Sequence, residues 1–143
     1  MRPLSLTPAA RAARNAALLS RADAGSSAAA TVALYSAAGG TLLGTRTLAK
    51  PCGNVNAAGR IELAADTAVT DLVLATGAAT WATWVAADGV VLGEGQVTDT
   101  TGFAGAVGAA TDTGDIGPWV LAGTSGTQLY EGGIVALTSA VLG

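Results

Sequence analysis

From Thr31 onward, short segments of alternating apolar and polar residues are separated by turn residues, and this pattern constrains the fold more than any other feature. Turn signals recur about every eight to twelve residues, which is typical of an all-β fold rather than an α/β fold. We therefore predict a mainly β protein: an antiparallel β-sandwich or a jelly-roll-like barrel with an N-terminal α-helical arm. The expected strands cover residues 31–36, 41–49, 60–65, 79–87, 90–98, 119–122 and 134–142, and residues 70–75 form a short strand or a loop that packs Leu72 and Leu74.

The arm is expected as a helix over about residues 8–22. Thr7 suits the N-cap position, and Pro8 suits the first helical position, where a backbone N–H is not needed. The Ala-rich segment that follows favours a helix, and Gly25 suits its end. Such a helix has little apolar surface to bury, so we expect it to lie outside the β body and to touch another chain. The chain then divides into an arm (1–25), a linker (26–30) and a β-sandwich domain (31–143).

Charge is distributed unevenly along the chain. Residues 1–23 carry four Arg and one Asp, whereas residues 24–143 carry three basic and nine acidic residues. A basic arm on an acidic body favours docking of the arm on a neighbouring subunit, and a simple solvated helix is the alternative. The arm residues expected at this interface are Arg11, Arg14, Leu18 and Arg21.

Small residues dominate the composition. Ala, Gly and Thr supply 71 of 143 positions, and Leu, Val, Ile and Phe together supply 32. Charged residues make up 12%, against about 25% in an average globular domain. A surface with so few charges is expected to be covered by other subunits, which predicts a homo-oligomer.

Missing residue types exclude several kinds of chemistry. The chain has no His and a single Cys, Cys52. His-based acid–base catalysis, an intramolecular disulfide and a Cys-rich zinc site are therefore excluded, and we expect no enzyme, no cofactor and no metal. The net charge of −3 and the sequence pI near 4.6 argue against nucleic-acid binding.

Two other kinds of site are considered and set aside. Glycines at 93, 95 and 102–108 lack the strand–turn–helix context of a nucleotide site. Because the chain has no His and few other polar side chains, the pairs of acids are not expected to form an active site, and no spacing matches a calcium loop. These pairs are Asp66 with Asp71, Asp88 with Glu94, and Asp112 with Asp115.

Aromatic residues are the other candidates for an interface. Trp81 and Trp84 are three apart in one expected strand, so they face opposite sides of the sheet. We predict that Trp81 lies in the core and that Trp84 anchors an interface, with two structural tryptophans as the alternative. Trp119 is a possible second anchor, and Phe103 lies in a long surface loop over residues 99–117, which is expected to be functional.

We expect neither a secretory signal nor a membrane-spanning segment. Three arginines interrupt the Ala-rich N-terminal stretch, so it does not resemble a secretory signal, and the apolar runs are too short to span a membrane. We expect a protein that folds in a cytoplasm, with Cys52 reduced.

Six short motifs are spread over nearly the whole chain. They are Ala13-Arg14-Asn15-Ala16, the segment Leu42–Pro51, the segment Ala78–Ala82, Asp88-Gly89, the segment Leu129–Gly133 and the segment Leu137–Leu142. Together they resemble a family of small uncharacterised virion structural proteins of tailed bacteriophages and prophages of proteobacteria. The resemblance implies a non-enzymatic virion protein. This chain departs from the family at Trp84, because the family often has Phe or Arg-Phe shortly after the first Trp.

Three hypotheses for the function follow. The first is an accessory virion protein that decorates or cements the capsid as a homo-oligomer, and the second is a component of the tail or baseplate. Both imply contacts with itself and with other virion proteins, no nucleic acid, no membrane, and a location in the virion after assembly in the host cytoplasm. The third, an adhesion or carbohydrate-binding module, is disfavoured because no signal peptide is evident.

Overall fold

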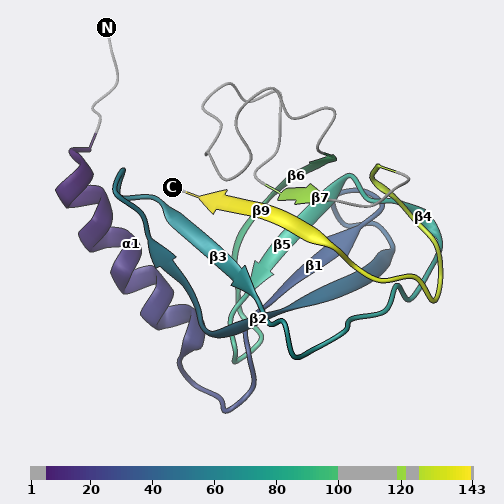
Figure 1. Cartoon of the computed structure of the whole chain (residues 1–143), viewed down its shortest axis with the longest axis horizontal. Helices are drawn as coiled ribbons and strands as arrows, with labels where there is room; N and C mark the ends of the chain where they lie inside the picture. Colours follow the sequence, from purple (N-terminus) through teal and green to yellow (C-terminus); the bar gives the residue numbers. More distant parts are fainter. Residues whose placement is uncertain (1–5, 100–118, 122–125, 143) are drawn as a thin grey trace, which may run out of the picture.

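The computed structural model describes residues 6–99, 119–121 and 126–142 (Figure 1). This part of the chain is mainly β with one N-terminal helix, which confirms the predicted fold class at that level. The elements are α1 (Pro8–Asp23), β1 (Thr31–Tyr35), β2 (Leu42–Val55), β3 (Ile61–Ala65), β4 (Gly77–Ala78), β5 (Trp81–Val85), β6 (Val91–Asp99), β7 (Trp119–Leu121), β8 (Gln128–Leu129) and β9 (Leu137–Leu142).

Seven of the described strands form a closed barrel in the order β1-β2-β3-β9-β7-β6-β5, and β4 pairs with β8 in a separate two-stranded sheet. Neighbouring barrel strands are antiparallel, except that β6 and β7 are parallel. The expectation of a wholly antiparallel fold is therefore wrong at this pair. The reason is chain length: residues 100–118 connect the two strands, and a parallel pair needs a connection of about a dozen residues or more.

Strand β2 is longer than predicted. The expected strand ends at residue 49, but β2 continues to Val55, with a shift of register against β3 between Leu48 and Gly53. Proline is tolerated in a strand at such an irregularity because no ladder hydrogen bond has to be donated there.

Trp81 and Trp84 lie on opposite faces of β5, as their spacing predicts, but the assignment of faces is wrong. Trp84 is 1% exposed in the barrel core, whereas Trp81 is half-buried and its indole N–H donates to Glu94 at 3.4 Å. The neighbouring strand decides the faces. Trp84 lies opposite the buried Val32 of β1, and Trp81 lies opposite the half-buried Tyr35.

Helix α1 begins at Pro8, and the Thr7 side chain accepts a hydrogen bond from the N–H of Ala10, as the capping pattern predicts. The expectation that the helix lies outside the β body is wrong. Leu19 and Ala22 are buried in the barrel's core cluster. The small side chains of the helix allow this close packing, because they let its backbone approach the barrel.

Gly59 in the β2–β3 turn shows how close the contact is. Its φ of +78° suits glycine, and an added Cβ would collide with the Pro8 carbonyl oxygen and lie 3.1 Å from the nitrogen of Ala12. The Gly59 carbonyl accepts a hydrogen bond of 2.7 Å from Asn15, which is 1% exposed. The first half of the helix therefore packs against this turn.

We predict that Gly59→Ala destabilises the protein more than Gly89→Ala does. Both glycines have positive φ, so each substitution is expected to cost about 1–2 kcal/mol in backbone strain. A Cβ at Gly89 meets nothing within 4 Å, whereas a Cβ at Gly59 displaces the helix. Chemical denaturation of both variants measures the difference, and equal losses would contradict the docking of α1 on this turn.

We also predict that Trp84→Ala lowers the free energy of unfolding by about 3–5 kcal/mol, because it empties a site in the barrel core. Trp81→Ala is the matched control on the other face of the same strand, and it is expected to lose much less. Thermal and denaturant unfolding of the two variants test this. A larger loss for Trp81→Ala would restore the opposite assignment of the faces.

Candidate functional site

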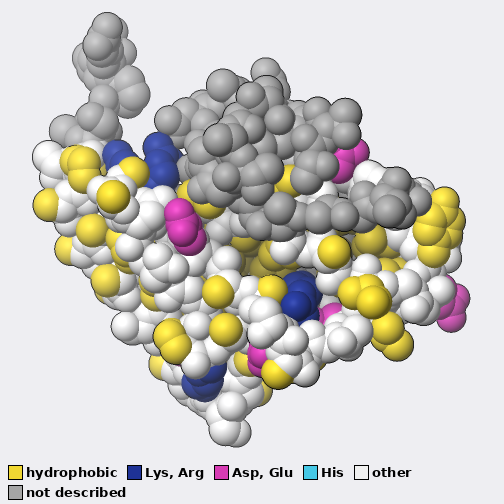
Figure 2. Space-filling model, viewed as in Figure 1, with side chains coloured by type: hydrophobic (Ala, Val, Ile, Leu, Met, Phe, Trp, Pro, Cys, Tyr) yellow, Lys and Arg dark blue, Asp and Glu magenta, His cyan; other side chains and the backbone are white. Residues whose placement is uncertain are grey.

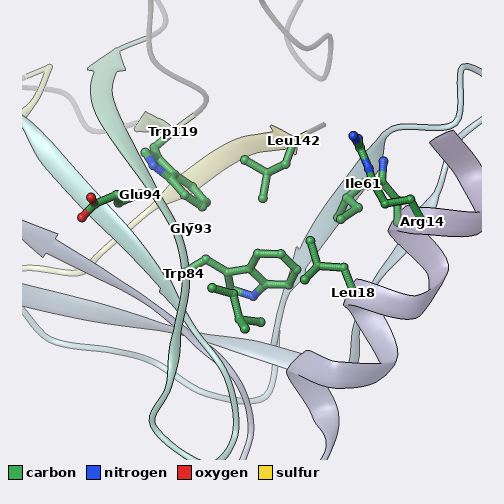
Figure 3. A pocket seen from close by; sticks show the side chains of 10 residues that line it. Arg14, Leu18, Ile61, Trp84, Gly93, Glu94, Trp119 and Leu142 are labelled. Atoms are coloured by element: carbon green, nitrogen blue, oxygen red, sulfur yellow. Dashed lines mark hydrogen bonds between the residues drawn. The ribbon is translucent and has the colours of Figure 1, made fainter. Parts of the chain in front are cut away.

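A cavity of about 180 Å³ lies between α1 and the barrel (Figure 3). Trp84 of β5 and Trp119 of β7 form part of its wall, and Leu18 reaches it from the helix (Figure 3). Its size is close to that of an engineered apolar cavity of about 150 Å³ that holds benzene. The remaining lining residues are Arg14, Asn15, Ile61, Leu92, Gly93, Glu94 and Leu142.

The cavity is apolar in character, and several of its polar groups already have partners. Arg14 donates from Nε to the Asn15 side-chain oxygen at 3.1 Å, and Asn15 donates onward to Gly59. The indole nitrogens of Trp84 and Trp119 are buried and have no hydrogen-bond partner among the described residues. The described lining therefore offers space for a small apolar group but no nucleophile paired with a base.

A second feature is an exposed apolar face, which we call the apolar ribbon. It consists of Leu72, Leu74, Tyr130 and Ile134, whose exposed fractions are 54%, 59%, 58% and 66%. Figure 2 shows apolar side chains gathered on the side of the molecule where β4 is labelled in Figure 1. The expectation that Leu72 and Leu74 pack inward is wrong, because the buried side chain of this segment is Val73, at 3%.

Backbone pairing sets the outward direction of the apolar ribbon. Leu72 and Ile134 form an antiparallel bridge, flanked by bonds from Val73 N–H to the Gly133 carbonyl (2.7 Å) and from Val135 N–H to the Asp71 carbonyl (3.0 Å). Val73 and Val135 face the core at 3% and 1% exposure, so their neighbours Leu72 and Ile134 face outward. Turning the apolar ribbon inward would expel both valines from the core.

A partly buried ion pair between Arg46 and Asp71 lies at one end of the apolar ribbon. The Asp71 carboxylate accepts hydrogen bonds from Arg46 (2.7 Å) and from the Thr47 N–H (2.7 Å) and hydroxyl (2.8 Å). The Arg46 guanidinium also donates to the carbonyls of Val69 and Asp66, both at 2.9 Å. Burial alone would raise the pKa of Asp71, but the bonds from Thr47 and Arg46 outweigh burial and hold this pKa below its ordinary value.

The arm residues predicted at a subunit interface make contacts within their own chain. Arg11 donates to the Ala58 carbonyl at 2.8 Å, and Arg21 forms an ion pair with Asp88 at 3.0 Å. Arg14 and Leu18 line the cavity described above. The basic arm thus meets an acidic residue of the same body, because the helix packs on the barrel instead of projecting from it.

The two tryptophans predicted as interface anchors are buried. Trp84 and Trp119 are each 1% exposed, because the inward face of the barrel carries few other large side chains and the indoles fill it. The spacing of Trp81 and Trp84 fixes that they lie on opposite faces, but neither this spacing nor the low charge of the chain tells which face is inside. Phe103, Asp112 and Asp115 lie outside the described residues, as does most of the 99–117 segment.

Cys52 lies under the C-terminal end of α1 and is fully buried. Its backbone N–H donates to the Asp23 carboxylate at 3.0 Å. Burial, together with the adjacent Asp23, raises the pKa of the Cys52 thiol to about 12, so the thiol stays protonated at neutral pH. This cysteine is a packing residue in the described structure.

Two searches of the described residues give negative results. They contain no group of three or more Asp, Glu, Cys or His side chains placed to hold a metal ion. In the same part of the chain, no helix has the length and apolar character needed to cross a membrane.

We predict that Asp71→Asn lowers the free energy of unfolding by about 1–3 kcal/mol at neutral pH, because Arg46 loses its charged partner. The folded-state pKa of Asp71 lies below the unfolded value of about 3.9. Wild type therefore keeps this stabilisation above about pH 4 and loses it as the pH falls through the folded-state pKa.

Denaturant unfolding of wild type and variant over a pH series measures this difference in stability. Asp66→Asn is the matched control, since the Asp66 side chain accepts from the Ala68 N–H while only its backbone carbonyl meets Arg46. A difference between wild type and Asp71→Asn that persists undiminished at the acid end would show that the charge of Asp71 is not the cause.

No protein-family model, curated protein or solved structure matches this chain.

Proposed function

We propose that this protein is a non-enzymatic structural protein of a bacteriophage particle, an accessory protein that decorates or cements the capsid as a homo-oligomer. The motif resemblance suggests the virion. The physical support is a surface suited to contacts with other proteins.

The observation that carries the proposal is the number of large apolar side chains left in contact with water. At least nine of them are more than a third exposed in the described part of a chain with only 12% charged residues. Four form the apolar ribbon, and two more, Val90 and Val91, lie at the β5–β6 hairpin. A free monomer gains nothing from such exposure, whereas a subunit of an assembly buries it.

The folded body supports the same proposal. The barrel closes on itself, so its described strands leave no long unpaired edge for uncontrolled pairing. Assembly then depends on defined side-chain surfaces, as a particle with a fixed number of subunits requires.

The experiment is to purify particles from a culture that carries the gene and to compare the amount of this protein with that of the major capsid protein by quantitative mass spectrometry. We expect a copy number comparable to that of the capsid protein. A copy number that is a small fraction of it would favour the tail or baseplate. Absence from purified particles, with the protein present in the lysate, would contradict a virion role.

A further inference from the structure

We propose that the cavity between α1 and the barrel is a binding site for one small uncharged aromatic molecule, about the size of a single ring. This inference goes beyond the proposed function and does not depend on it. Its support is the origin of the cavity at Gly93, the chemistry of the wall and the volume enclosed.

The cavity exists because an inward-facing position of β6 has no side chain. Gly93 lies directly opposite Trp84 in the antiparallel pair of β5 and β6, and residues directly opposite each other share a face of the sheet. Trp84 is buried in the core, so a side chain at residue 93 would also point inward. An added Cβ at Gly93 meets no described atom within 4 Å. The open space therefore follows from a single residue.

The wall around this space is mostly carbon. Figure 3 shows Gly93 between the indoles of Trp84 and Trp119, and aliphatic side chains from the helix and from other strands complete the lining. Water is a poor occupant of such a space, because it needs two to four polar partners to replace the hydrogen bonds that it gives up. The aliphatic side chains are Leu18 of α1, Ile61 of β3, Leu92 of β6 and Leu142 of β9.

The polar side chains of the lining favour an uncharged ligand. Arg14 donates to the Asn15 side chain, and Asn15 donates onward to the Gly59 carbonyl. Glu94 accepts from the indole N–H of Trp81, and in Figure 3 its carboxylate points away from the indoles that line the cavity. A charge taken from water into apolar surroundings without a dedicated partner is strongly disfavoured.

The volume limits the size of the ligand. Sites for drug-sized molecules enclose about 300–1,000 Å³. This cavity encloses about 180 Å³, close to the engineered cavity of about 150 Å³ that holds benzene. A single ring with a small substituent therefore fits, and a larger molecule does not.

The two indoles favour an aromatic ring over an aliphatic ring of the same size. Aromatic rings attract one another in offset-stacked or edge-to-face arrangements, in addition to the gain from burying their area. Trp84 and Trp119 are each 1% exposed, so the surrounding core already holds them in place and little order has to be gained on binding. An aliphatic ring gains burial alone.

The test is titration of the full chain with benzene, followed by calorimetry and by the indole N–H signals in heteronuclear NMR spectra. We expect saturable binding that shifts the signals of Trp84 and Trp119. Trp81 on the outer face of β5 is the internal control, and Trp81→Phe assigns its signal. Benzene is expected to bind about two- to tenfold more tightly than cyclohexane, and more tightly than benzoate.

Gly93→Leu is the variant that fills the cavity. Gly93 is not among the glycines with positive φ, so its backbone accepts a side chain without strain. We expect benzene binding to weaken at least about tenfold, because the ligand loses its buried apolar site. Gly93→Val is a second, smaller variant. Gln96→Leu is the matched control, since Gln96 lies opposite Trp81 and adds its bulk to the outer face of the same strand.

Several outcomes would overturn the proposal. One is the absence of saturable binding up to the solubility of benzene in water. Another is equal binding by wild type and by a Gly93→Leu variant that circular dichroism shows to be folded, and Gly93→Val decides the point if Gly93→Leu is unfolded. Cyclohexane that binds as tightly as benzene would contradict the aromatic class, and benzoate that binds more tightly would contradict the uncharged class.

The dependence on protein concentration separates a free ligand from a side chain of another copy. Benzene binding that weakens as the protein concentration rises would show that a second copy fills the cavity, which also overturns the proposal. The abundance of the protein in purified particles bears on the proposed function alone, so the two proposals can fail independently.

Discussion

The structure depends on two inward-facing indoles in a chain that has few large side chains. Trp84 and Trp119 are the largest fully buried residues of the described core, and they come from strands on opposite sides of the parallel β6 in the barrel order. The rest of the interior is filled by aliphatic side chains and by the close approach of backbones where Ala and Gly occur. A core of this kind tolerates loss of an indole poorly, because the surrounding structure relaxes only partly into the cavity that is left.

The docking of α1 depends in the same way on small side chains. Ala22 is fully buried, and its carbonyl accepts a hydrogen bond of 2.8 Å from the Ala87 N–H before the β5–β6 turn. Gly59 and Ala22 thus hold the two halves of the helix on different parts of the barrel. The helix is stabilised by its packing on the barrel. An Ala-rich helix that would be only marginally stable in isolation is therefore stable in this protein.

The apolar ribbon reverses the usual arrangement of polar outside and apolar inside. Its charged anchor, Arg46 with Asp71, is 13% and 12% exposed, whereas the leucines that it positions are more than half exposed. The neighbouring Val73 and Val135 stay buried beneath this face. The chain thus combines a modest core with an exposed apolar face whose backbone is held by hydrogen bonds.

Local patterns in the sequence determined where most elements lie: Thr7 and Pro8 start the helix, turn residues separate the strands, and odd spacing places Trp81 and Trp84 on opposite faces. These features depend on residues close in the chain. Only the tertiary structure decided which face of β5 is inside, because that depends on Val32 and Tyr35 across the sheet. Barrel closure, the parallel pairing of β6 with β7, the docking of α1 and the exposure of Leu72 beside buried Val73 depend equally on partners distant in sequence. Alternation of residues along a strand does not tell which of its two faces points into the core. That face is decided when the strand pairs with its neighbours.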